Sequence, residues 1–187
     1  MNRKYEFTGE IMECMGRTLY RIRAVRDFGE VKAGDLGGWI ETESNLSNDG
    51  NAWVSGNAWV YGDAAVSGNA AVSGDARVSG NARVSGNAWV SGDALVFGDA
   101  LVFGGAWKTS PLYIQGSRWP AYMSAPDVFT IGCQSHTLEY WGEHYKAIAR
   151  ANGAEDIIGE YMEYYNIAVK RYGKKEDKPC KQTESEA

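Results

Sequence analysis

Two arginines, Arg77 and Arg83, stand six residues apart, at positions that elsewhere in the same segment hold mostly alanine, tryptophan and leucine. A guanidinium group presents a planar fork of N–H donors that matches a phosphate, and an aromatic ring can stack on a nucleobase. Trp59, Tyr61 and Trp89 flank the two arginines in the sequence. Together the five residues predict a binding site for a small anionic ligand, such as a nucleotide.

Three further residues, Arg118, Trp119 and His136, follow this segment, and we expect them to close the site from the C-terminal side. Cys133 and His136 also suggest two other roles, a nucleophile with its base or a pair of metal ligands. Two ligands do not make a zinc site, and a reactive thiolate needs an electropositive pocket. A structural histidine that ties a helix start to the preceding strand is the competing role. The sequence predicts no catalytic residue, no metal site and no cofactor.

The element that must position the arginines is a six-residue word, V-S-G-(N/D)-A-x, which runs without slippage from Val54 to Val102. Because side chains alternate along an extended chain, the alanine and valine of each word face one side and the residue between them faces the other. Glycine followed by Asn or Asp is typical of a turn. Each word therefore predicts one short strand and one corner, with alanine and valine in the core.

These words resemble the hexapeptide repeats of left-handed parallel β-helices, triangular prisms with three hexads in each coil. The resemblance implies a mainly β fold with about three to four coils, in which every third word stacks. An N-terminal β-hairpin cap and a C-terminal module of β-strands and two helices are expected to flank the coils. The expected stacks of outward residues are Trp53, Ala71, Trp89 and Trp107 on one face, Trp59, Arg77 and Leu95 on the next, and Ala65, Arg83 and Leu101 on the third.

The predicted outer surface is too apolar for a single prism in water. Leu95, Phe97, Leu101 and Phe103 all point outward beside the tryptophans. Such an area exceeds what a monomer normally exposes, so we expect self-association, and the resemblance implies a homotrimer. Because Arg77 and Arg83 lie on adjoining faces, one subunit cannot aim both at one ligand, whereas neighbouring subunits can.

The two ends of the chain give further expectations. RIRAVRDFGEVKAGDLGGWIE resembles the leader of hexapeptide proteins in phages and enterobacteria, and IGCQSHTLEYW resembles their tail module. Arg21, Arg23 and Arg26 in the leader are expected to form a solvated strand face. Two or three strands, with turns at Pro120 and Pro126, are expected before the helices. The predicted divisions are the cap at 1–39, the β-helix at 40–107, a short β segment at 108–136, a helical module at 137–172 and a disordered tail at 173–187.

Charge and composition indicate which classes of partner the protein can bind. Residues 33–107 carry two arginines against eight acidic residues, and such a body repels a long nucleic acid. No apolar stretch is long enough to cross a membrane, and the start lacks the apolar core of a signal peptide. Three widely spaced cysteines fit a reducing compartment. We therefore expect a cytoplasmic protein, in the host cell if a phage encodes it, with neither a membrane nor a long nucleic acid as partner.

Three functions follow from these features. The first is a non-catalytic trimer that holds a nucleotide-like ligand and sequesters a signal of host defence. The second is a structural or adaptor trimer, in which Arg77 and Arg83 pair with Asp75, Asp93 or a neighbour's acid. The third is the acyltransferase activity found in many proteins of the resembled family. Those enzymes use a histidine on the coil and a loop thrown out of it, and this sequence has no histidine before His136.

Overall fold

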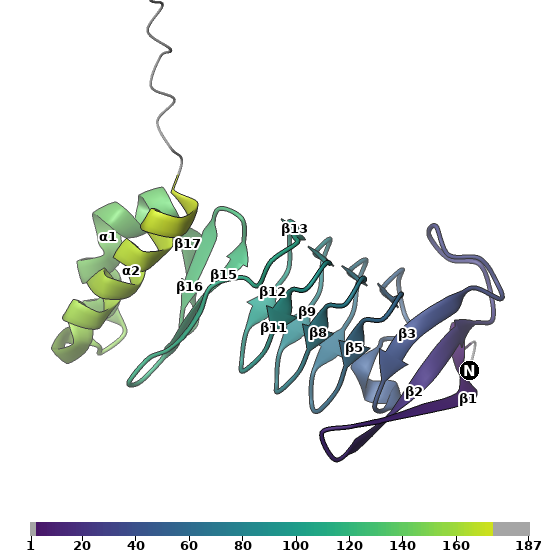
Figure 1. Cartoon of the computed structure of the whole chain (residues 1–187). Helices are drawn as coiled ribbons and strands as arrows, with labels where there is room; N and C mark the ends of the chain where they lie inside the picture. Colours follow the sequence, from purple (N-terminus) through teal and green to yellow (C-terminus); the bar gives the residue numbers. More distant parts are fainter. Residues whose placement is uncertain (1–2, 174–187) are drawn as a thin grey trace, which may run out of the picture.

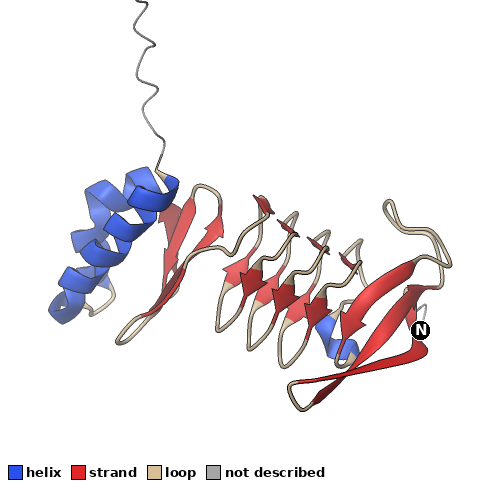
Figure 2. Ribbon diagram, viewed as in Figure 1, coloured by secondary structure: helices blue, strands red, loops and turns tan. Residues whose placement is uncertain are grey.

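The computed structural model describes residues 3–173. A β-solenoid occupies the middle of the molecule, with a hairpin at its N-terminal end and a small sheet and two helices at its C-terminal end (Figure 1). Figure 2 shows that strands dominate and that the long helices lie together beyond the last coil. The mainly β fold predicted from the repeat is therefore confirmed. No helix among the described residues has the length and apolarity that crossing a membrane requires.

The N-terminal cap is a hairpin whose sheet continues into the solenoid. Strands β1 (Tyr5–Cys14) and β2 (Arg17–Ala24) pair antiparallel around Met15 and Gly16, both of which have positive φ. Strand β3 (Leu36–Ile40) pairs antiparallel with β2 and parallel with the solenoid strand β5 (Trp59–Val60). Backbone hydrogen bonds thus link the hairpin to the first coils through β3. The pairing of β3 with β5 also supplies partners for backbone groups that the edge of a bare coil would expose.

The solenoid has about four turns and three parallel sheets, and most of its strands have two residues and pair with strands 18 residues away. One sheet contains β3, β5, β8 and β11, another β4, β7, β10 and β13, and the third β6, β9 and β12. The remaining strands are β4 (Trp53–Val54), β6 (Ala65–Val66), β7 (Ala71–Val72), β8 (Arg77–Val78), β9 (Arg83–Val84), β10 (Trp89–Val90), β11 (Leu95–Val96), β12 (Leu101–Val102) and β13 (Ala106–Trp107).

The alanines and valines of the words form the core, as their alternation predicts. All of them from Ala52 to Val102 are buried, and they stack coil upon coil. The corner glycines adopt positive φ and lie so close together that a Cβ on Gly74 would meet the nitrogen of Gly92 at 2.9 Å. Asn51, Asn69 and Asn87 form a ladder of side-chain hydrogen bonds of 3.2 Å along one corner.

The last coil departs from the repeat, and the prediction that Trp107 faces outward is wrong. Three residues separate β12 from β13, whereas four separate the earlier strands of the repeat. The shorter corner shifts the register, so that Trp89 pairs with Ala106 and Val90 with Trp107. Trp107 therefore takes a core position at the end of the prism, where its Nε1–H donates to the Gly104 carbonyl and its ring meets Tyr172 edge-on.

The C-terminal module is an antiparallel sheet covered by two helices. It contains four strands, not the predicted two or three: β14 (Tyr113–Gln115), β15 (Pro120–Ala125), β16 (Val128–Ile131) and β17 (Gln134–Thr137). Pro120 begins β15, while Pro126 does lie in a turn. Helices α1 (Leu138–Ala151) and α2 (Ile158–Tyr172) follow, with the short 3-10 helix η2 (Glu155–Ile157) between them; another, η1 (Glu43–Asn45), precedes β4. Of the predicted tail, 174–187 lies outside the described residues.

Candidate functional site

Arg77 lies directly over the ring of Trp59, one coil away on the same sheet. The guanidinium carbon is 4.2 Å from the centre of the ring. Strand β8 pairs in register with β5 on one side and β11 on the other, so Trp59, Arg77 and Leu95 form one outward row. The 18-residue spacing of the words predicts this row, because residues three words apart stack.

A second arginine–tryptophan pair continues the row toward the N-terminal hairpin. Arg21 of β2 pairs in register with Trp39 of β3, and its guanidinium carbon lies 5.2 Å from the centre of that ring. The two pairs line a groove of about 330 Å³, the Arg77 groove. Its described lining residues are Met12, Arg21, Trp39, Asn57, Trp59, Asp75 and Arg77.

The electrostatics of the Arg77 groove favour an anion. Its lining includes two arginines and one aspartate, and Asp75 already accepts a hydrogen bond from Asn57 at 3.2 Å. Within residues 3–173, neither Arg77 nor Arg83 forms a salt bridge. The buried Nε of Arg21 also has no hydrogen-bond partner in this part of the chain. The groove thus offers cationic N–H donors beside two indole rings.

Reasoning from the sequence missed Arg21 and Trp39. The arginines of the leader were expected to form a solvated face, yet Arg21 lines the groove because β2 is hydrogen-bonded to β3. A signal for Trp39 was available. It precedes Trp59 by 20 residues, one coil plus the two extra residues of the irregular Ser47–Ala52 segment, and β3 pairs it with Trp59.

Tyr61 turns toward the hairpin. The Arg17 guanidinium lies 5.7 Å from the centre of its ring and is bound at 2.8 Å to both carboxylate oxygens of Glu41. The backbone N–H of Gly62 donates to Glu41 at 2.7 Å, and this bond, together with Arg17, lowers the pKa of that carboxyl group. Tyr61 and Trp59 share a small cavity under the hairpin with Arg17. Tyr61 therefore supports the hairpin next to the groove.

Arg83 and Trp89 lie on the other two faces of the prism. Arg83 of β9 stands between Ala65 and Leu101 in the third sheet. Trp89 of β10 is 54% exposed, and its Nε1–H donates to Ser73 at 3.2 Å. One chain therefore does not gather Arg77, Arg83 and Trp89 around one ligand. The repeat geometry predicts this separation, because it places the two arginines on adjoining faces.

The three C-terminal residues of the predicted site are not among those that line the Arg77 groove. Arg118 makes a bidentate pair with Asp156, with distances of 3.1 and 2.8 Å, and donates to the Gly153 carbonyl. The His136 ring stacks on Tyr140, which in turn stacks on His144. Trp119 lines a different pocket, between the last coil and the C-terminal sheet. A part for these three residues in closing the site stays a prediction.

The described residues contain no candidate metal centre. Among the described residues there is no group of three or more His, Cys, Asp or Glu side chains placed to hold an ion. The Cys133 thiol lies in the turn before β17 and accepts a hydrogen bond from Gln134 at 3.4 Å.

The parallel sheets and the stacked six-residue words define a β-solenoid repeat protein. Within it, residues 76–92, which include β8, β9 and β10, match the model of the family described as YdcK Beta solenoid repeat, so this segment is similar to that family. No curated protein matches the chain. The match supports the solenoid and leaves the function to be argued from the site.

Proposed function

We propose that the protein is a non-catalytic, homotrimeric binding protein that holds a small anionic, nucleotide-like ligand beside Arg77. The observation that carries the proposal is the Arg77 guanidinium, stacked 4.2 Å from the Trp59 ring and without a salt bridge among the described residues. A stacked guanidinium still has its in-plane N–H donors free for an anion. Trp39 and Arg21 repeat the arrangement one step along the groove.

The apolar surface beside the groove supports self-association. Leu95 pairs in register with Arg77, and Leu95 and Phe97 are each 43% exposed. Leu101 and Phe103, which follow Arg83 on the third face, are each 44% exposed. A second copy seated on Leu95 and Phe97 would bound the Arg77 groove and exclude water from it. Arg83 of an adjacent subunit would then add a second cation to the site.

In this proposal the protein acts by retaining its ligand. Within an infected bacterium, that action would sequester a nucleotide signal of host defence. The support for this role is the resemblance of the leader and tail segments to phage proteins, together with a groove suited to a phosphate and a base. The structural or adaptor role draws on the same apolar rows, which would then contact a different protein.

Native mass spectrometry of the protein purified from phage-challenged cells tests the proposal. We expect a trimer with up to three copies of a nucleotide, which is then released and identified. Arg77→Ala should weaken retention about tenfold or more, because charge-assisted hydrogen bonds are lost. Arg150→Ala, on α1 and paired with Glu155, is the matched control and should retain the ligand.

Other outcomes favour the alternatives. A trimer that is empty and ignores added nucleotides would support the structural role. Bound coenzyme A, with acetyl transfer that His136→Ala abolishes, would instead establish an acyltransferase. If Arg77→Ala and Arg83→Ala retain the nucleotide as well as the wild-type protein does, the assignment of the site to these arginines is overturned.

A further inference from the structure

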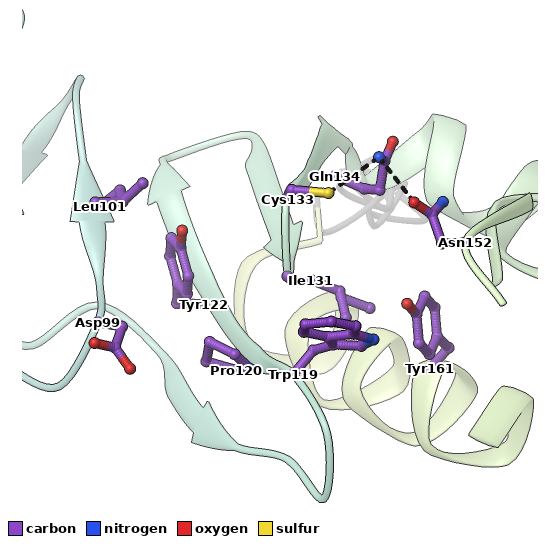
Figure 3. Close-up of a pocket in the computed structure, with 11 residues that line it drawn as sticks. Asp99, Leu101, Trp119, Pro120, Tyr122, Ile131, Cys133, Gln134, Asn152 and Tyr161 are labelled. Atoms are coloured by element: carbon purple, nitrogen blue, oxygen red, sulfur yellow. Dashed lines mark hydrogen bonds between the residues drawn. The ribbon is translucent and has the colours of Figure 1, made fainter. Parts of the chain in front are cut away.

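A larger pocket lies where the solenoid meets the C-terminal module, away from the residues of the Arg77 groove (Figure 3). This junction pocket has a volume of about 600 Å³, within the range of small-molecule sites. The last coil, the C-terminal sheet, the turn after α1 and helix α2 all contribute to it. Its described lining residues are Asp99, Leu101, Trp119, Pro120, Tyr122, Ile131, Gly132, Cys133, Gln134, Asn152 and Tyr161.

Two tyrosines in the wall are almost completely buried. Tyr122 of β15 is 3% exposed and Tyr161 of α2 is 1% exposed, yet both line the pocket. Figure 3 shows the Tyr161 hydroxyl on the side of its ring that faces Trp119 and Asn152. Tyr122 stands between Trp119 and the Leu101 strand in the same view. Trp119 is 40% exposed and offers an open ring face, whereas the rings of Tyr122 and Tyr161 are covered.

The hydroxyl groups of these tyrosines have no hydrogen-bond partner within residues 3–173, although Tyr5 and Tyr164 donate to protein groups and Tyr172 accepts from the backbone N–H of Leu112. Burial raises the pKa of both Tyr122 and Tyr161, so each keeps its proton at neutral pH. Among the described residues, the buried side-chain N and O atoms without a partner are Arg21 Nε and Arg26 Nε, so both tyrosine hydroxyls are open to the pocket, where a ligand can bond to them.

The charge of the junction pocket selects against anions. Among the described lining residues Asp99 has the charged side chain, and it accepts a hydrogen bond from Asn81 at 2.9 Å. The nearest arginine in sequence, Arg118, is held by Asp156. Gln134 and Asn152 place an amide pair at the other end, linked at 3.3 Å. The pocket thus combines aromatic walls and neutral polar groups with one negative charge.

We propose that the junction pocket binds an uncharged planar heterocycle of the nucleoside class, stacked on Trp119 and hydrogen-bonded to the hydroxyls of Tyr122 and Tyr161. This second site is independent of the Arg77 groove. The two differ in charge preference, since one presents arginines and the other a carboxylate.

Calorimetric titration of the full chain with adenosine, guanosine, cytidine and uridine tests this site. We expect at least one nucleoside to bind. Tyr122→Phe and Tyr161→Phe should each weaken binding about fivefold, because each loses one buried hydrogen bond to the ligand. Their thermal stability without ligand should be nearly unchanged, since neither hydroxyl bonds to another described group. Tyr164→Phe, on the same helix and outside the lining, is the control and should bind normally.

Two further readouts locate the ligand. The bound nucleoside should slow alkylation of Cys133, which lines the pocket, and leave the rate at Cys14 in the hairpin unchanged. In Arg77→Ala, which lacks the anion site of the groove, the matching 5′-monophosphate should bind more weakly than the nucleoside, and adding Asp99→Asn should reduce that difference. The proposal is overturned if no nucleoside binds, if Cys133 is not protected, if the two Phe variants bind normally, or if Arg77→Ala abolishes nucleoside binding.

Discussion

Lys4 is a fully buried cation at the start of the solenoid. Its ammonium group donates to the Ala52 carbonyl at 2.8 Å and lies 5.0 Å from the centre of the Phe28 ring. Burial, with a smaller effect from the charge of Arg26, lowers the pKa of Lys4 from 10.5 to about 8. The side chain joins the N-terminus to the first coil, and its stabilising effect therefore depends on pH.

We predict that Lys4 makes stability rise between pH 7.5 and 9.5. In this range the unfolded chain still holds the proton that the native chain has lost, so the free energy of unfolding increases with pH. Urea titrations should show a gain about 1 to 2 kcal/mol larger than in Lys4→Met, whose curve lacks this contribution. Parallel curves for the two proteins would contradict the prediction.

The pH range of this measurement must end below pH 10, because above it the ionisation of tyrosines lowers the free energy of unfolding. Burial raises the pKa of Tyr5 and Tyr164 to about 12. Stability from these groups is present below pH 10 and is lost as the pH rises through 12. Tyr5 remains in Lys4→Met, so the comparison between the two proteins isolates the lysine.

Single residues were predictable from the sequence where the repeat fixes their neighbours. The stacking of Arg77 on Trp59 follows from a spacing of three words, and the structure has that register. Arg118 has its partner Asp156 in a different element, and no spacing rule connects them. Tyr122 and Tyr161 meet at one pocket only because α2 packs on β16, the neighbour of β15 in the sheet, and no local sequence pattern reveals this contact.

At the level of elements, the glycine positions at the corners of the coils leave no room for a side chain. Gly74 has a φ of +68°, and a Cβ there would lie 2.9 Å from the nitrogen of Gly92 in the next coil. Both the left-handed conformation and the contact are unfavourable for alanine. We predict that Gly74→Ala lowers the free energy of unfolding by about 1 to 3 kcal/mol, measured by denaturant titration.

Gly159 in α2 is the matched control. A Cβ there meets nothing within 4 Å, and its φ is not positive. Alanine should therefore raise stability by about 0.5 to 1 kcal/mol, because it reduces the entropy of the unfolded chain. Equal effects of the two substitutions would show that the corner geometry is not limiting.

Elements were predictable while the repeat held and less so where it ended. The coil strands, the turn at Met15 and Gly16 and the two C-terminal helices all follow local patterns that the structure confirms. The inward position of Trp107 was not predicted, although the sequence holds a sign of it. Lys108 stands where the word has valine, and the shorter corner moves Trp107 into that core position. The short strand β14 likewise depends on β15, its hydrogen-bonding partner.

On the scale of the whole molecule, a group of exposed apolar side chains lies on the last coils, at Trp89, Leu95, Phe97, Leu101 and Phe103. Leu95 and Phe97 together should contribute to an interface between copies. We predict that the protein sediments at three times the mass of one chain, and that Leu95→Ser with Phe97→Ser shifts it to monomers. Both residues face outward, so the circular dichroism spectrum should not change.

Ile11→Ser with Met15→Ser is the control, because it removes exposed apolar residues from the distant hairpin tip. That variant should remain trimeric. A wild-type protein that sediments as a monomer at micromolar concentration would contradict the assembly and remove Arg83 from the ligand site.

The stacking of words three by three has a consequence for how such a chain can change length. Nearly identical words invite recombination between them, which removes or adds residues in steps of six. Loss of 18 residues, such as 61–78, joins Val60 to Ser79 and shortens the prism while every later residue keeps its face. Loss of six rotates the C-terminal module by one face, about a third of a turn, relative to the hairpin. Descendants that preserve both the hairpin and the junction pocket in one orientation should therefore differ by whole coils.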